Sequence, residues 1–313
     1  MIYQIIGSDN AKTTEDYVRD WAPRLKGAIH VIFIEELFKL KRLPVGSFLF
    51  CDIERLDKEH RELLAQVYEQ LESFGPPMRL FNHPLKAKNR LELLDAMYRA
   101  GVNPYRAFPA ANVPADLRFP AFIRVGQDHH GARTEPLSSW GELEQKLIAA
   151  LMSGWALDRL LVIEYCDTAD GTGTFAKYNA YRVGDRIVPR GVTFGQEWQL
   201  KGRDASAVWR ADLKWEYVRS NPYAGQLMNV FQLANIEFGR IDYSVKDGKI
   251  VVWEINTAPV FSNGPPSEQS EERREIHQFT ADGLAGALEK ISQLTSELRV
   301  EIGLSWPPFR GRS

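Results

Sequence analysis

The sequence has little cysteine, little net charge and no long apolar run, and each shortage excludes a class of protein. Only two of its 313 residues are cysteine, Cys51 and Cys166. Both lie in apolar stretches, so we expect buried free thiols in a reducing cytoplasm. No stretch approaches the roughly 18 apolar residues of a membrane span, and the N-terminus lacks the basic and apolar regions of a secretory signal. The formal net charge of −2 mixes acids with bases, so we expect no nucleic-acid or membrane partner.

What the sequence does contain indicates a well-packed protein of several subdomains. It is 44% hydrophobic over 313 residues, which is too long for one small core. Residues 1–82 alternate short apolar runs with helical stretches, a pattern typical of a parallel sheet covered by helices. Asp52 follows the third run, at the edge where open parallel sheets place functional groups. The simpler alternative is that Asp52 only begins a helix.

Three oxygen-bearing side chains stand out in the C-terminal third. Two apolar runs, 241–245 and 250–255, read as a β-hairpin. Asp242 lies in the first run, Glu254 lies in the second, and Asn256 directly follows the second. Carboxylates among apolar neighbours need a partner, because burying an unpaired charge is costly. Three oxygen donors without a nearby thiol suit Mg²⁺ or Mn²⁺. The alternative is an ordinary hairpin edge whose acids face water.

The length of the hairpin loop decides whether these donors share one face of the sheet. A two-residue turn at Asp247 and Gly248 would point Asp242 away from Glu254, because side chains alternate along a strand. A three-residue loop over 246–248 puts all three donors on one side. We therefore predict the three-residue loop.

The stretches G-R-I-D-Y (239–243) and W-E-I-N-T-A-P (253–259) resemble the metal-binding end of ATP-grasp enzymes. That group includes D-alanine–D-alanine ligases and ribosomal-protein S6 modification ligases. The resemblance implies that the three donors hold Mg²⁺ ions bridging the phosphates of ATP. It also implies that Arg240 contacts the reacting phosphate and the acceptor. After Pro259 the chain departs from the D-alanine ligases, which leaves the acceptor substrate open.

A cluster of cations lies near residue 88. Lys86, Lys88 and Arg90 fall in the first turn of a helix predicted over 85–99, where the helix dipole disfavours positive charge. Such a cluster needs open solvent or a nearby anion. The resemblance favours a phosphate of ATP, which we assign to Lys88, with Lys86 as the alternative.

A strand expected over residues 120–126 leads into a loop with a glycine at each end, which by itself is a weak signal. The resemblance implies a loop that covers the phosphates of ATP with backbone N–H groups. Arg124 stands where these enzymes usually carry a lysine. The residues assigned to the phosphates are Arg124, Gly126, His129, His130 and Gly131. The two histidines could also be exposed loop residues.

The apolar run 160–166 predicts a buried strand, and the resemblance places the adenine of ATP beside it. It implies recognition of the adenine by backbone groups of Ile163–Tyr165. It further implies that the carboxylate of Glu164 or Asp167 lies near the amino group or the ribose.

A second hairpin, predicted over 175–183 and 186–192, carries Lys177 and Arg182. Acyl phosphate chemistry needs cations beside the transferring oxygens, and these two residues are our catalytic candidates together with Arg240. A solvated strand face is the alternative for both.

Together these features predict an α/β (α+β) protein with an ATP-grasp fold. We expect a parallel-sheet domain over 1–82, subdomains over 83–165 and 166–300, and a tail over 301–313. The predicted activity is ATP- and Mg²⁺-dependent joining of a carboxylate to an amine through an acyl phosphate. The substrates are a small acid or a peptide, and a homodimer is left open. The alternatives are a small-molecule kinase and a non-catalytic nucleotide-binding protein.

Overall fold

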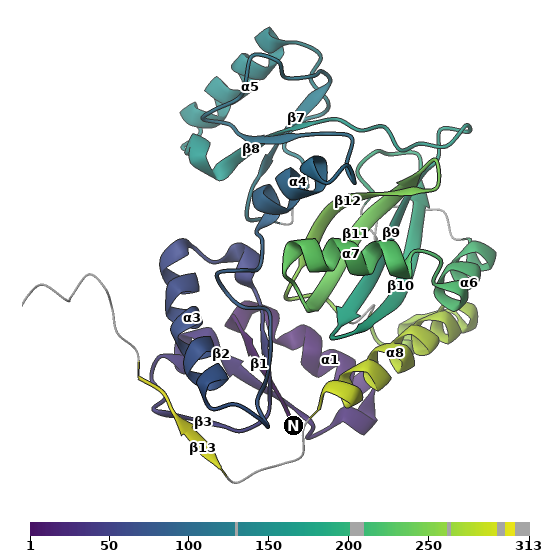
Figure 1. The fold of residues 1–313 in the computed structure, drawn as a ribbon. Helices are drawn as coiled ribbons and strands as arrows, with labels where there is room; N and C mark the ends of the chain where they lie inside the picture. The colour runs from purple at the N-terminus through teal and green to yellow at the C-terminus, as the bar shows by residue number, and fades with distance from the viewer. Residues whose placement is uncertain (129–130, 201–209, 262–263, 293–297, 304–313) are drawn as a thin grey trace, which may run out of the picture.

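The computed structural model describes residues 1–128, 131–200, 210–261, 264–292 and 298–303, which form three consecutive parts (Figure 1). The N-terminal part holds a parallel sheet, and the middle and C-terminal parts hold antiparallel sheets. The predicted mixture of a parallel sheet with α+β subdomains is confirmed. Within the described ranges, no helix combines the length and the apolar character that crossing a membrane requires.

The parallel sheet has the strand order β2-β1-β4-β5. Its strands are β1 (Ile2–Ile6), β2 (Ile29–Phe33), β4 (Ser47–Phe50) and β5 (Arg79–Phe81). The helices of this part are α1 (Lys12–Asp20), α2 (Ile34–Leu37) and α3 (Lys58–Ser73). Tyr17 of α1 packs in one core with Ile6, while Leu64 of α3 packs in another with Ile5. Because neighbouring strand residues point to opposite faces, the two helices cover opposite faces of the sheet.

The end of the described chain returns to this N-terminal part. β13 (Arg299–Glu301) pairs antiparallel with β3 (Arg42–Pro44), and Ile302 is buried. The predicted boundary at residue 300 therefore divides a strand. A pairing between segments so far apart in the sequence leaves no local pattern from which to predict it.

The middle part is an antiparallel sheet of order β6-β8-β7 covered by a helix. Its elements are β6 (Ala107–Pro109), β7 (Ala121–Val125), β8 (Leu160–Glu164) and α5 (Trp140–Met152). Leu143 of α5 packs with Ile123 and Val162 in a small core of its own. That core supports β7, the strand that leads into the predicted phosphate-covering loop.

The helix α4 (Arg90–Arg99) begins five residues later than predicted. Asn89 caps it: the Asn89 side chain accepts a hydrogen bond from the N–H of Glu92 at 3.0 Å, and the Glu92 carboxylate accepts one from the N–H of Asn89 at 2.8 Å. This reciprocal capping fixes the start of the helix. Lys86 and Lys88 therefore precede the helix, and Arg90 is its first residue.

The C-terminal part holds a sheet of order β10-β9-β11-β12 (Figure 1). Its strands are β9 (Phe175–Val183), β10 (Arg186–Gly195), β11 (Phe238–Lys246) and β12 (Lys249–Asn256). Its helices are α6 (Ala211–Ser220), α7 (Ala224–Ala234) and α8 (Glu271–Ile291). Phe231 of α7 packs in one core with Ile241 and Tyr243 of β11. The residues that alternate with these two along β11 therefore face away from α7.

The hairpin between β11 and β12 turns through two residues, so the predicted three-residue loop is wrong. Lys246 pairs with Lys249 across the turn. Asp247 and Gly248 both adopt left-handed backbone angles, with φ of 51° and 74°. Two consecutive residues in that conformation form the tight turn that best matches the twist of the strands.

The prediction relied on an odd number of loop residues to bring the donors to one face. An extra residue within β12 has this effect instead. Tyr243 pairs with Val252, but its neighbour Asp242 pairs with Glu254, so Trp253 is an extra residue in β12. Such a β-bulge shifts every later side chain of the strand to the other face. The bulge thus brings Glu254 to the same face as Asp242.

Contacts from the middle of the chain hold the bulge in place. The Asn103 side chain bonds both backbone groups of Val252, at 2.8 and 2.9 Å, and the Tyr105 hydroxyl donates to the same carbonyl. The bulged Trp253 stacks on Tyr105 and donates its indole N–H to Ser244 at 2.9 Å. These bonds satisfy the edge strand where its own ladder is interrupted.

Glu164 is bound by two arginines at the end of β8. Arg106 Nε lies 2.9 Å from Oε1 and Arg118 Nε lies 3.0 Å from Oε2, and Glu164 is buried. Burial alone raises the pKa of Glu164, but the hydrogen bonds from Arg118 and Arg106 outweigh it and lower the pKa to about 2. Both oxygens are taken up by this ion triad, so its position does not support the predicted contact with adenine or ribose.

Replacing Glu164 with Gln is expected to lower the free energy of unfolding at pH 7 by roughly 3 kcal/mol, because two guanidinium groups lose their carboxylate. The folded pKa of about 2 lies below the ordinary 4.5. The triad therefore contributes fully above about pH 5 and loses its contribution as the pH falls from 4.5 toward 2. Urea unfolding of both proteins at pH 7 and about pH 3 should show a smaller difference at the lower pH; an equal difference at both would contradict this.

Candidate functional site

Four polar side chains of the β11–β12 hairpin share the sheet face opposite α7. Asp242 lies directly across from Glu254, and Arg240 lies across from Asn256. On the other side of β11, Asn179 of β9 lies across from Asp242. The structure thus brings the three predicted oxygen donors onto one surface and adds Asn179 to them.

Close approach of the two strands at this point requires a glycine. A Cβ atom on Gly239 would lie 2.9 Å from the carbonyl oxygen of Asn256, which is closer than real side chains allow. Only glycine can therefore precede Arg240 while β11 remains paired with the end of β12.

Asp242 is 5% exposed and has a cation on each side. Arg240 Nε lies 2.9 Å from Oδ1, and Lys177 Nζ lies 3.7 Å from Oδ2. A buried carboxylate needs such partners to offset the loss of water. Arg240 and Lys177 therefore lie where the sequence analysis places catalytic cations, beside the first of the donors.

Glu254 is held by two arginines from outside the large sheet. Arg90 donates to its carboxylate, and Arg124 of β7 lies 3.4 Å from the same oxygen. Burial lowers the pKa of Arg124, and the neighbouring Arg90 lowers it further. The two like charges therefore repel each other beside a single carboxylate, and an additional negative group would relieve this repulsion.

Arg90 is the cation of the segment around residue 88 that contacts Glu254, and the assignment of Lys88 to a phosphate stays a prediction. The backbone N–H of Lys88 donates to the carbonyl of Ala234 at 2.9 Å. Asn89 caps α4, so Arg90 is the first residue of the helix, and its guanidinium donates to the carboxylate of Glu254.

Three buried polar atoms in this region lack a hydrogen-bond partner within the described part of the chain. They are Oδ1 of Asn256, Nε of Arg90 and Nε of Arg124. Buried polar groups are nearly always satisfied, so an open acceptor and two open donors indicate a ligand that carries both signs of charge. A divalent cation suits the amide oxygen, and an anion suits the guanidinium groups.

The donor set fits Mg²⁺ or Mn²⁺ better than a softer metal. Among the described residues, no three Asp, Glu, His or Cys side chains form a metal-binding group. The donors proposed for a metal are two carboxylates, those of Asp242 and Glu254, and the amide oxygen of Asn256. Hard oxygen donors of this kind suit the hard divalent cations.

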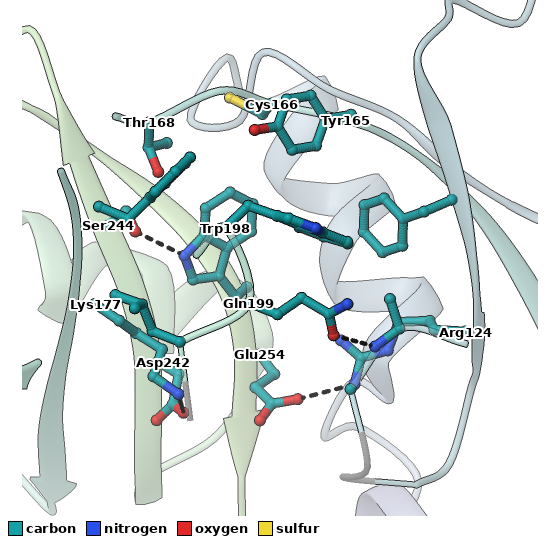
Figure 2. A pocket seen from close by; sticks show the side chains of 16 residues that line it. Arg124, Tyr165, Cys166, Thr168, Lys177, Trp198, Gln199, Asp242, Ser244 and Glu254 are labelled. Carbon is teal, nitrogen blue, oxygen red and sulfur yellow. Dashed lines mark hydrogen bonds and ion pairs between the residues drawn. The ribbon is translucent and has the colours of Figure 1, made fainter. Parts of the chain in front are cut away.

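A cavity of about 170 Å³ extends from these charges between the middle and C-terminal parts (Figure 2). At one end lie Arg124, Lys177, Asp242 and Glu254, and at the other lie Tyr165, Cys166 and Thr168, with Trp198 between them (Figure 2). The ring of Trp198 lies 5.0 Å from that of Phe122 and 5.6 Å from that of Tyr165. A charged end joined to an aromatic end matches a nucleotide, whose phosphates need cations and whose base stacks on rings.

Several residues assigned to the nucleotide lie at this cavity, and others do not. Arg124, Gly131 and Tyr165 line it, and the carbonyl of Gly126 accepts a hydrogen bond from the nearby Arg90. Asp167 is exposed, and its carboxylate instead accepts the N–H of Ala169 at 2.9 Å. The residues assigned within the loop that lie outside the described ranges are His129 and His130.

Arg182 lies on the wrong face of β9 for the predicted catalytic role. It is an odd number of residues from Lys177, so the two side chains point to opposite sides of the sheet. Its guanidinium donates to the carbonyls of Gly184 and Ile236, each at 2.8 Å. It thus ties the β9–β10 turn to the start of β11.

Two kinds of residue at the site are not among the predicted ones. Asn179 is an amide in a strand with buried neighbours, 8% exposed, and that exception to the apolar pattern was a usable signal. The aromatic lining from Phe122, Trp198 and Trp253 had no such signal. It joins strands and loops that are distant in the sequence.

No protein-family model matches the chain, and no curated protein sequence matches it significantly. Among solved structures, the ATP-grasp ligase PsnB in complex with a minimal precursor is 15% identical, with 91% of this chain and 99% of that chain covered and a TM-score of 0.52. PsnB in complex with minimal precursor, Mg and ADP is 16% identical, with 92% of this chain and 97% of that chain covered and a TM-score of 0.50. The chain has the ATP-grasp fold. A D-alanine–D-alanine ligase from Bacillus anthracis complexed with ATP superposes less closely, at 14% identity, 93% and 97% coverage and a TM-score of 0.48.

Asp242→Asn is expected to weaken the binding of Mn²⁺ by roughly 10- to 100-fold, because it removes one of two charged donors. Electron paramagnetic resonance titration of free Mn²⁺ measures this loss. Asp247→Asn, the same substitution in the exposed turn of the same hairpin, is the matched control and should leave the affinity unchanged. Equal affinities in both variants would show that the metal binds elsewhere.

Proposed function

We propose that this protein is an ATP- and Mg²⁺-dependent ligase that joins a carboxylate to an amine. One observation supports this most: Asn256, with its open amide oxygen, and Arg90 and Arg124, with their open guanidinium nitrogens, all contact Glu254, which lies across from Asp242. Such a set complements a cation bound to an anion, which is what Mg²⁺ with a nucleotide triphosphate is.

The charge of each residue at the site decides its proposed role. Asp242, Glu254 and Asn256 would hold Mg²⁺ or Mn²⁺, which when bound neutralises phosphate oxygens. Arg124, 3.4 Å from Glu254, would bind the phosphates of ATP. Lys177, 3.7 Å from Asp242, would stabilise the charge of the transferring group together with Arg240.

The aromatic end of the cavity would take the base. Tyr165 and Trp198 line it, and their rings offer the flat apolar surfaces on which a base stacks. The N–H of Tyr165 is already bonded to the carbonyl of Pro120 at 2.8 Å. Backbone recognition of the base would therefore use the carbonyl of Tyr165 or the backbone groups of Cys166 rather than this N–H.

Two steps would join the substrates. An oxygen of the acceptor carboxylate attacks the γ-phosphorus of ATP, and the bond to the bridging oxygen breaks to release ADP. The amine nitrogen then attacks the acyl carbon of the acyl phosphate, the carbon–oxygen bond breaks to release phosphate, and the amine loses a proton. The protein contributes position and electrostatic stabilisation to both steps.

The likeness to PsnB agrees with the use of ATP, since a structure of that ligase holds Mg and ADP with its precursor. At 15–16% identity it does not extend to the substrates. We propose a small acid or a peptide as the carboxylate, because the cavity opens between two parts of the protein.

The proposal is tested by incubating the protein with ATP, Mg²⁺ and a panel of amino acids, small acids and short peptides. A ligase releases both ADP and phosphate, and only when a carboxylate and an amine are present together. ADP formation with the phosphate retained on the product would identify a kinase instead. Nucleotide binding without turnover on the whole panel would favour a non-catalytic protein.

Once a substrate pair is found, Lys177→Met is expected to lower kcat roughly 100-fold or more, because it removes a cation aimed at the transferring group. Lys249→Met removes an exposed lysine from the neighbouring hairpin and should leave kcat unchanged. The measurement is the steady-state rate of phosphate release by each variant. Equal rates in the two variants would remove Lys177 from the proposed mechanism.

A further inference from the structure

The guanidinium of Arg90 donates hydrogen bonds to four acceptors of the protein itself, more than a residue that only binds phosphate would need. Its Nη1 donates to the carbonyls of Val125, Gly126 and Asp128, at 3.2, 2.8 and 2.8 Å. Its Nη2 donates to the carboxylate of Glu254. The side chain is only 5% exposed. One guanidinium thus joins the proposed metal carboxylate to residues 125–128, which we call the loop base.

Only an arginine can make these contacts at once. The guanidinium is planar and carries five N–H donors in a fixed fork, whereas the ammonium of lysine is a point charge on a flexible stem. A lysine at position 90 would keep the positive charge near Glu254. It would have too few donors in the right directions to hold three carbonyls of the loop base as well.

We propose that Arg90 is a positioning residue that links the loop base to the state of the metal site. The inference rests on the proposed function, because it takes Glu254 to be a metal ligand. Nη1 holds the loop base in place whether or not metal is bound. Nη2 shares Glu254 with the metal, so the cation and the arginine compete for one carboxylate.

This arrangement has a consequence for nucleotide binding. When a metal binds Glu254, the Nη2 of Arg90 loses its share of that carboxylate and can donate to an anion instead. The cation and the phosphates of the nucleotide would therefore bind together more readily than either alone, because each compensates the charge that the other displaces. The loop base would remain attached to Arg90 throughout.

Two substitutions of Arg90 separate its two contacts. Arg90→Met removes both the charge and the donors, and Arg90→Lys keeps the charge but loses the fork. Both should speed hydrogen exchange of the Gly126 amide, which donates to the carbonyl of Arg159 at 2.9 Å, by about tenfold or more, because the loop base loses its charged hydrogen bonds and opens more readily. Only Arg90→Met should tighten the binding of Mn²⁺ to the nucleotide-free protein, by roughly tenfold, because it alone removes the competing charge.

The controls are the same substitutions at Arg99, which lies on the same helix, is 77% exposed and pairs only locally with Asp95. Arg99→Met and Arg99→Lys should change neither readout. A fold damaged by substitution would exchange faster and bind Mn²⁺ more weakly, so tighter binding in Arg90→Met cannot come from damage.

Faster exchange in both Arg90 variants, with tighter Mn²⁺ binding in Arg90→Met alone, supports the inference. Unchanged exchange in both variants overturns it even if the wild-type protein turns over ATP. Weaker Mn²⁺ binding in Arg90→Met also overturns it, because Arg90 would then support the metal site rather than compete with it. A wild-type protein that binds no Mn²⁺ overturns the proposed metal site and this inference together, and the turnover assay with ATP tells that failure from the others.

Discussion

The pairing of Asp242 with Glu254 across two antiparallel strands is the constraint on which the site depends. The strands meet in register because Trp253 is an extra residue in β12. Without it, the regular alternation of side chains would send Glu254 and Asn256 toward the core under α7. The bonds from Asn103 and Tyr105 to Val252 hold that irregularity. The middle of the chain thus fixes the geometry of the hairpin.

The balance of charge explains why the buried Asp242 can lie beside Glu254, whose side chain is 16% exposed. Four cations surround them, from four different elements: Arg90, Arg124, Lys177 and Arg240. The excess of positive charge suits a site that receives a polyanion. Glu164 is the opposite case, because Arg106 and Arg118 use both of its oxygens. Glu164 thus has a structural role, whereas Asp242 and Glu254 lie in the region that contains the open donors and the open acceptor.

The N-terminal part also contributes to the site, although it donates no ligand to the cavity. Thr257 directly follows Asn256, and its hydroxyl accepts the N–H of Ile53 at 3.0 Å. The N–H of Thr257 donates to the carboxylate of Glu54 at 3.2 Å, and Thr257 is 1% exposed. The loop after β4 therefore anchors the end of the strand that carries Glu254 and Asn256. Through this anchor, the parallel sheet limits how far that strand end can move.

The sequence by itself determined the parallel sheet of residues 1–82, the β11–β12 hairpin and its oxygen donors, because alternation, turn residues and acids in apolar runs are local patterns. Only the tertiary structure decided how the donors converge, since a bulge has no local signature and its support comes from residues 103 and 105. It also decided that Arg90 contacts Glu254, that Arg106 and Arg118 hold Glu164, and that Arg182 bonds the carbonyls of Gly184 and Ile236. Long-range contacts set where a long charged side chain points, and the spacing of residues along the chain does not record them.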